Sequence, residues 1–149
     1  IQKLDVKKLK SSGYIISSLN FTKYINHKFL DLIFQSNAYR VFTEVDKILK
    51  IKKIKLIVPH YVLLKGFFKK FSNKIIKYNI YKNKKLKIKR NYCCFDKNLV
   101  LIYALCFCIS NKINEIKIFG LTKSSSNLKI IDIFKNFKGT NSKFTISVR

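Results

Sequence analysis

The feature that most constrains the fold of this chain is an apolar segment that leads directly into a strand-like segment. Eleven apolar residues follow one another without a break at positions 99–109. A helix that is apolar on all sides has to be buried on most of them. Residues 110–114 are polar apart from Ile113, and residues 115–121 then have the composition of a short strand. Because such a helix–strand pair is half of an α/β unit, we expect it to lie at the centre of a twisted sheet.

Strand-like and helix-like segments alternate along the rest of the chain. Aliphatic and β-branched runs predict strands at residues 14–21, 30–34, 54–58, 75–81 and 144–148. Apolar residues at helical spacing predict helices at residues 38–49, 60–71 and 128–137. This order is typical of an α/β fold with one doubly wound, mostly parallel Rossmann-like sheet and helices on both faces. The 149 residues contain no repeat or linker, so we expect a single domain over 1–149.

The charge of the chain is strongly positive. There are 32 basic and 7 acidic residues, for a formal charge of +25. Such a charge is typical of proteins that bind nucleic acid or an anionic membrane. Codon drift in an AT-rich genome is a second explanation, because Lys, Asn, Ile, Phe and Tyr have A/T-rich codons and only three of the basic residues are Arg. The total charge therefore leaves both explanations open.

The positive charge is concentrated in one third of the chain. Sixteen of the 32 basic residues lie between residues 47 and 95, where no acid occurs. Three tyrosines, Tyr78, Tyr81 and Tyr92, border the most basic run. Phosphate contacts from lysines and stacking on aromatic rings are how proteins hold single-stranded nucleic acid, although a merely solvated surface has the same composition. The residues predicted for this role are Lys82, Lys84, Lys85, Lys87, Lys89 and Arg90.

A second candidate site follows from the predicted sheet. In open α/β sheets, ligands bind beyond the carboxyl ends of the strands, so polar residues that follow strands are suited to hydrogen-bond a nucleotide or a sugar. The same residues also suit ordinary turns and helix caps. Histidine is a side chain suited to general acid or base catalysis, so His60 is a candidate for that role, and an ordinary loop histidine is the alternative. The candidate residues are Asn20, Ser36, Asn37, His60, Asp96, Asn98, Gly120, Thr122 and Ser124.

Several other classes of protein find no support in the sequence. It contains no Walker motif, no GxGxxG, no GxSxG and no His/Cys spacing of a metal site, so we expect neither a cofactor nor a metal. The four cysteines suit small buried hydrophobes in a reducing compartment. Residues 99–109 are too few to cross a bilayer, and residues 1–14 lack the apolar region of a signal peptide. We therefore expect a cytoplasmic protein.

Several segments resemble the Rossmann-like domain of family 42 sialyltransferase-like proteins, and the related domain that follows the barrel in some bacterial 4-hydroxy-2-oxovalerate aldolase-like proteins. In those proteins an Asp-Asn or Ser-Gly pair opens an apolar helix, and a strand of the type KEIYLxGxD follows it. Residues 1–21 resemble the segment after their Gly-Pro-Ser-Leu loop, and residues 30–40 resemble their second strand, DYxFFSNxxRY. The matching positions are Asp5, Leu9, Asn20, Asn37, Arg40, Asp96, Asn98, Glu115, Ile116, Ile118 and Gly120.

The resemblance implies a glycosyltransferase-like domain in the biosynthesis of cell-surface glycans such as lipopolysaccharide. Its ligand would be a nucleotide-sugar or a similar anionic small molecule, held near Asn20, Ser36, Asn37 and Gly120. The chain lacks the Gly-Pro-Ser loop and any methionine, so we expect that its N-terminal strand and loop are missing. Leu121 and Thr122 stand where the family has an acid. The transferases of this family have a catalytic histidine beyond the central strand, whereas no histidine follows His60 in this chain. We therefore assign no catalytic residue. The alternatives are a basic, ribosome-associated RNA-binding protein and a degraded reading frame.

Overall fold

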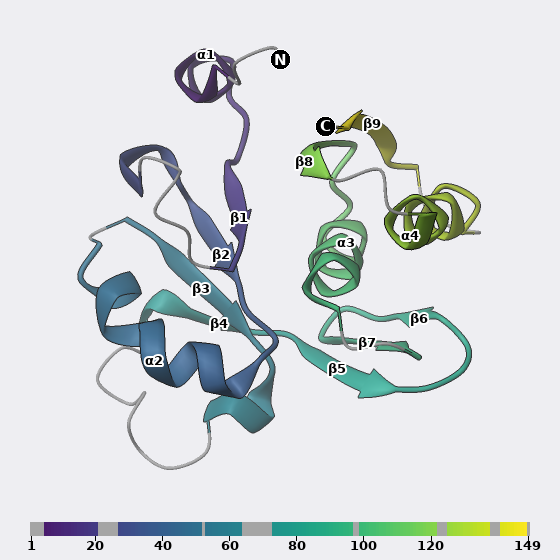
Figure 1. Ribbon diagram of the computed structural model, residues 1–149, viewed down its shortest axis with the longest axis horizontal. Helices are drawn as coiled ribbons and strands as arrows, with labels where there is room; N and C mark the ends of the chain where they lie inside the picture. The colour runs from purple at the N-terminus through teal and green to yellow at the C-terminus, as the bar shows by residue number, and fades with distance from the viewer. Residues whose placement is uncertain are drawn as a thin grey trace.

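The computed structural model describes residues 5–20, 27–51, 53–63, 73–96, 99–121, 125–137 and 141–148. Within these ranges the chain has an α/β fold (Figure 1). Its helical elements are α1 (Val6–Ser11), η1 (His27–Phe29), α2 (Ala38–Leu49), η2 (His60–Leu63), α3 (Val100–Ser110) and α4 (Ser125–Lys135). Its strands are β1 (Ser17–Leu19), β2 (Leu32–Phe34), β3 (Lys55–Val58), β4 (Ile75–Lys77), β5 (Asn79–Lys82), β6 (Lys87–Ile88), β7 (Tyr92–Phe95), β8 (Glu115–Leu121) and β9 (Lys143–Val148).

The first sheet is parallel and has four strands in the order β1-β2-β3-β4. Successive side chains of a strand point to opposite faces, and both faces of this sheet are covered. Ile33 and Leu56 pack with α2 in one apolar cluster, whereas Phe34 and Ile57 pack with α3 in another. The predicted parallel α/β arrangement is confirmed for these strands, and α2 spans the residues predicted for it.

The predicted strand at residues 75–81 is divided in the structure at Tyr78. The Tyr78 amide donates a hydrogen bond to the Val58 carbonyl at 3.1 Å, and the Asn79 amide donates to the Asn91 carbonyl at 2.9 Å. Neighbouring amides of a strand point to opposite edges, so β3 and β7 flank opposite edges of one bent strand. The second sheet, in the order β5-β7-β6, therefore continues from the first at Tyr78. β7 was not predicted, and its partner β6 is antiparallel to it.

The apolar helix is buried, as predicted. α3 packs on strands of both sheets, and Figure 1 shows it between β1 and β2 on one side and β6 and β7 on the other. Its side chains from Leu101 to Cys106 are buried. Tyr103 and Phe107 meet Phe34 and Tyr78 in a cluster of rings whose centroids lie 5.4–6.2 Å apart. This aromatic cluster joins the helix to both sheets.

The strand after this helix differs from the prediction that it lies at the centre of one sheet. β8 pairs in parallel with β9, and in the described part of the chain this pair forms a third sheet. Side chains connect β8 to the start of β1: the Tyr14 hydroxyl donates to a Glu115 carboxylate oxygen at 2.5 Å, and the Lys117 Nζ lies 4.4 Å from the Tyr14 ring centroid. Because these contacts use side chains instead of backbone groups, they bring β8 near β1 without adding it to the sheet.

The two other predicted helices differ from the structure in their bounds. The predicted helix at residues 60–71 begins as η2, and residues 64–72 lie outside the described residues. The predicted helix at residues 128–137 corresponds to α4, which begins three residues earlier. Among the described residues, no helix has the length and hydropathy that a membrane-spanning helix requires.

Candidate functional site

The carboxyl ends of β1, β2 and β3 meet at one edge of the first sheet because these strands are parallel. Asn20 follows β1 with φ at +64°, a left-handed conformation that Asn tolerates better than most residues. Its amide donates to the Phe34 carbonyl at 2.9 Å, and the Ser18 hydroxyl donates to its carbonyl at 2.6 Å. Asn20 therefore forms a turn that is held to the end of β2.

Ser36 and His60 also lie at this edge, and two residues that were not predicted hold them. The Tyr61 hydroxyl donates to the Ser36 carbonyl at 2.5 Å. The His60 amide donates to the side-chain oxygen of Asn79 at 2.7 Å. The sequence signal for Asn79 was hidden because it stands within the strand predicted at residues 75–81, and Tyr61 was assigned to the predicted helix.

Two buried polar side chains lie at the same edge. Within the described residues, the buried polar side chains are Ser18 in the middle of β1 and Gln35 and Ser36, which directly follow β2. The Gln35 Nε2 donates to a Glu44 carboxylate oxygen at 2.5 Å, whereas the Gln35 Oε1 has no hydrogen-bond partner. Buried acceptors are usually paired. The edge thus offers one buried acceptor that a ligand donor or a water molecule can satisfy.

The other predicted residues have different roles or lie outside the described residues. Asn37 caps α2, where its side-chain oxygen accepts from the Arg40 amide at 3.3 Å. Gly120 lies in a bulge of β8, in the third sheet, with φ at +76°. Asp96 is exposed and does not cap α3, because the N-cap position is Leu99 and has no side-chain hydrogen bond. Asn98, Thr122 and Ser124 lie outside the described residues.

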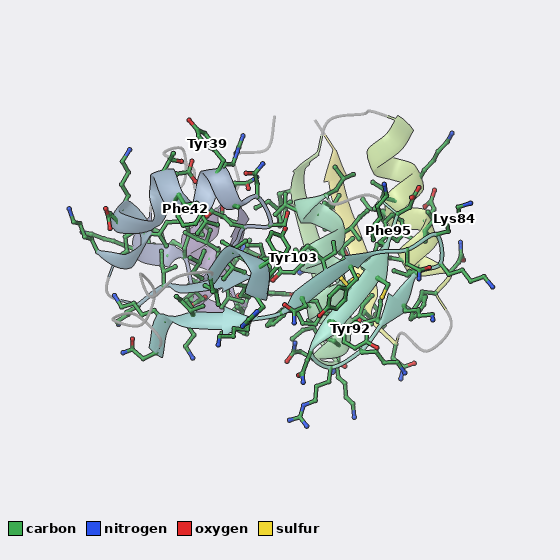
Figure 2. The ribbon with its side chains drawn as sticks, turned by 90° about the horizontal axis from the view of Figure 1, so that it is seen from below. Tyr39, Phe42, Lys84, Tyr92, Phe95 and Tyr103 are labelled. Atoms are coloured by element: carbon green, nitrogen blue, oxygen red, sulfur yellow. The ribbon has the colours of Figure 1, made fainter. Side chains whose placement is uncertain are left out.

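The second candidate site is the outer face of the β5-β7-β6 sheet. Alternate residues of its strands, including Ile80, Ile88 and Cys93, pack inward on the cluster that contains α3 and α4. The intervening residues point to the other face. Figure 2 shows the molecule from the side of this outer face, with Tyr92 in front of the strands. In register, Tyr81 stands opposite Cys94, and Cys94 stands opposite Lys87. Tyr81, Cys94 and Lys87 therefore form a row across this face.

The side chains of two tyrosines lie on this outer face. Tyr81 is 52% exposed, and its ring lies edge-to-face with that of Tyr92, with centroids 5.6 Å apart and planes at 73°. The prediction that Tyr78 belongs with them is wrong, because Tyr78 is only 1% exposed and its hydroxyl donates to the Lys89 carbonyl at 3.3 Å. Burial, together with the neighbouring Cys93, raises the pKa of Tyr78. Tyr78 thus belongs to the core, whereas Tyr81 and Tyr92 belong to the outer face.

The six predicted basic residues are all exposed. They lie on β5, on β6 and in the turns that flank β6. In the part of the chain that the structure describes, none of the six takes part in an ion pair. The basic face, which we define as this outer face together with the exposed cations of its strands and adjoining turns, consists of Tyr81, Tyr92, Lys82, Lys84, Lys85, Lys87, Lys89 and Arg90.

Two of the four cysteines, Cys93 and Cys106, are core residues, whereas Cys94 lies on the outer face of its sheet and Cys108 is partly buried. Cys93 and Cys106 are buried, and the hydrogen bond between their thiols, together with burial, raises the pKa of Cys106. Burial raises the pKa of Cys108 to about 11. Over the described residues, no cluster of three or more His, Cys, Asp or Glu side chains is arranged to hold a metal ion.

Comparison of the chain with protein-family models, with curated proteins and with solved structures gave no match. The resemblance to sialyltransferase-like proteins and to the domain of the aldolase-like proteins therefore stays a prediction. The basic face and the carboxyl edge of the first sheet are the two sites from which a function can be argued.

Proposed function

We propose that this protein binds nucleic acid through the basic face. The observation that carries the proposal is the position of Tyr81, which is 52% exposed, and of the half-buried Tyr92 on the outer face of a sheet whose six exposed cations form no ion pair within the described residues. The chain has no acid between residues 47 and 95 that would repel phosphates there. Each lysine that neutralises a phosphate releases condensed counterions, and this release supplies most of the affinity of non-specific binding.

Codon drift makes a different prediction from a binding face. If drift alone placed the lysines, exposed cations anywhere on the protein would contribute equally to the binding of a polyanion. If the basic face is the site, cations on that face contribute more than cations elsewhere. Lys7, Lys8 and Lys53 are exposed and lie on α1 or beside β3, so they provide a control set of equal charge.

The experiment measures the affinity for a fluorescent oligouridylate at fixed salt by anisotropy. We expect the triple variant K87Q/K89Q/R90Q to bind at least tenfold more weakly than the K7Q/K8Q/K53Q control. Both variants remove three charges from exposed positions, so a difference reports location. Equal affinities of the two variants would contradict the proposal and favour codon drift.

A second candidate function rests on the carboxyl edge of the first sheet. We propose as this alternative a doubly wound, Rossmann-like, glycosyltransferase-like domain that holds a nucleotide-sugar beside Asn20, Ser36 and His60. The observation that favours it is the burial of Gln35 and Ser36 at this edge, where the Gln35 Oε1 has no hydrogen-bond partner among the described residues. Both functions agree with the cytoplasmic location proposed from the sequence.

Thermal unfolding with cytidine and uridine nucleotides tests the alternative. A ligand that binds only the folded state and is present at 100 times its Kd stabilises that state by about 2.7 kcal/mol. For a chain of this size such a ligand raises Tm by several degrees. The alternative predicts this shift for at least one nucleotide, and it fails if none of them changes Tm.

A further inference from the structure

The two tyrosines of the basic face have a geometry that charge alone does not require. Tyr81 and Tyr92 are diagonal neighbours on one face, because Asn79 pairs with Tyr92 and Tyr81 pairs with Cys94. Their rings meet edge-to-face and do not stack on each other. The Tyr81 ring consequently keeps a surface open to solvent, and its side chain is one of the most exposed large apolar groups described.

We infer that the basic face holds unpaired nucleic acid, with a base stacked on Tyr81 and the adjoining phosphates on Lys87 and Lys89. This inference rests on the proposed function and names the class of its ligand, a single strand. A single strand can turn a base onto an aromatic ring, whereas the bases of a duplex are already stacked on one another. A duplex therefore gains only the phosphate contacts at this face.

The spacing of the row across the sheet fits this arrangement. Tyr81 and Lys87 flank Cys94 on its two neighbouring strands, and strands of a sheet lie roughly 5 Å apart. The backbones of Tyr81 and Lys87 are therefore about 10 Å apart, so the flexible lysine side chain can reach the sugar–phosphate chain of a base that lies on Tyr81. Cys94, the residue between them in the row, is small and buried.

The scaffold holds this row in place. β5 and β7 pair through four consecutive residues, and their inward side chains Ile80 and Cys93 are buried against α3. Tyr81 therefore occupies a fixed position on a rigid strand, whereas Lys84 and Lys85 lie in a turn. Pre-ordering of the aromatic ring lowers the entropy lost when a base binds.

The test compares single-stranded and duplex probes with the full chain. The probes are an oligouridylate and an oligothymidylate of about 12 nucleotides and a duplex RNA of equal length, all at one salt concentration. Loss of one stacked base weakens binding roughly fivefold to a hundredfold. We expect the Tyr81→Leu variant to lose this factor with the single strands and to keep its affinity for the duplex.

Two control variants separate stacking from misfolding. Tyr81→Phe keeps the ring and is expected to bind single strands as the wild type does. Tyr39→Leu changes a tyrosine that is 76% exposed on α2, and we expect it to change neither affinity. Preference for RNA or DNA is read from the two single-stranded probes and does not affect the inference.

The outcomes also separate this inference from the proposed function. If K87Q/K89Q/R90Q weakens binding to all probes more than its charge-matched control, while Tyr81→Leu weakens none, the basic face binds nucleic acid and the stacking inference is overturned. A wild-type protein that binds the duplex more tightly than the single strands overturns it as well. If K87Q/K89Q/R90Q and the charge-matched control bind every probe equally, the proposed function itself fails.

Discussion

The hydroxyl of Tyr103 on α3 donates a hydrogen bond of 2.5 Å to the carbonyl oxygen of Tyr78, the residue that joins β4 to β5. Both side chains are buried, and their ring centroids lie 5.6 Å apart. The Tyr78 amide is bonded to β3 through the Val58 carbonyl. The central helix therefore fixes the point at which the bent strand leaves the first sheet and enters the sheet that carries the basic face.

Removal of this hydroxyl is expected to destabilise the protein. In Tyr103→Phe the carbonyl of Tyr78 loses a buried donor, and an unpaired buried polar group costs about 1–3 kcal/mol. Denaturant unfolding should therefore show a free energy of unfolding that is lower by about that amount. As a control, Tyr81→Phe removes a hydroxyl from a side chain that is 52% exposed, and we expect it to leave the stability within about 0.5 kcal/mol. Equal effects of the two substitutions would argue against the Tyr103–Tyr78 bond.

Asn37 is expected to act on stability as a helix cap. Its side chain accepts from the Arg40 amide at the start of α2, and replacement of such a cap by Ala typically costs about 1 kcal/mol. Asn37→Asp keeps an acceptor and should restore most of the loss. The measurement is the urea midpoint of the three proteins, and an unchanged midpoint in Asn37→Ala would rule out the capping role.

Stability is expected to fall at alkaline pH because of the thiols on α3. Burial raises the pKa of Cys108 from its ordinary value of 9.0 to about 11. Above pH 9 the unfolded chain therefore releases a proton that the folded chain retains, and each pH unit lowers the stability by roughly 1 kcal/mol until the folded thiol ionises. Below pH 9 this group contributes no pH dependence.

The Cys108→Ala variant isolates this effect from the titration of the lysines. We expect the difference in unfolding free energy between wild type and variant to be constant from pH 7 to about 9. Between about pH 9 and 11 the unfolding free energy of the wild type should fall relative to that of the variant. Guanidinium titrations at fixed pH values provide the measurement. Parallel curves over the whole range would show that the Cys108 thiol does not have a raised pKa.

The elements that the sequence predicts best are those whose side chains are all of one kind or strictly periodic. The unbroken apolar run at residues 99–109 is compatible only with a buried helix, and α3 and β8 occur where this run and the next strand were predicted. α2 was also predicted to the residue, because Val41 and Ile48 share one face and Asn37 supplies the cap.

Other features depend on contacts that a local pattern does not contain. The bend at Tyr78 is invisible in the sequence because tyrosine fits an extended strand, and it becomes a core residue only through Tyr103 and Phe107. β7 is four residues long and contains Cys93 and Cys94, which suit helices and strands alike, so nothing marked it as a strand.

The candidate sites show the same division. The density of lysines in the sequence predicted the basic residues. The alternation of side chains along the strands decides which tyrosines accompany them, and it places Tyr81 and Tyr92 on the outer face. At the other edge, sequence order predicted Ser36 and His60 but not their partners Tyr61 and Asn79, because partners across strands depend on the register of the sheet.

The salt dependence of oligouridylate binding tests the central claim most directly. For single strands, log affinity falls with log salt by about 0.7 for each neutralised phosphate. If Lys87, Lys89 and Arg90 each contact a phosphate, K87Q/K89Q/R90Q should reduce the magnitude of this slope by roughly 2, while K7Q/K8Q/K53Q keeps the wild-type slope. A slope that is the same in wild type and both variants would contradict the assignment of nucleic-acid binding to the basic face.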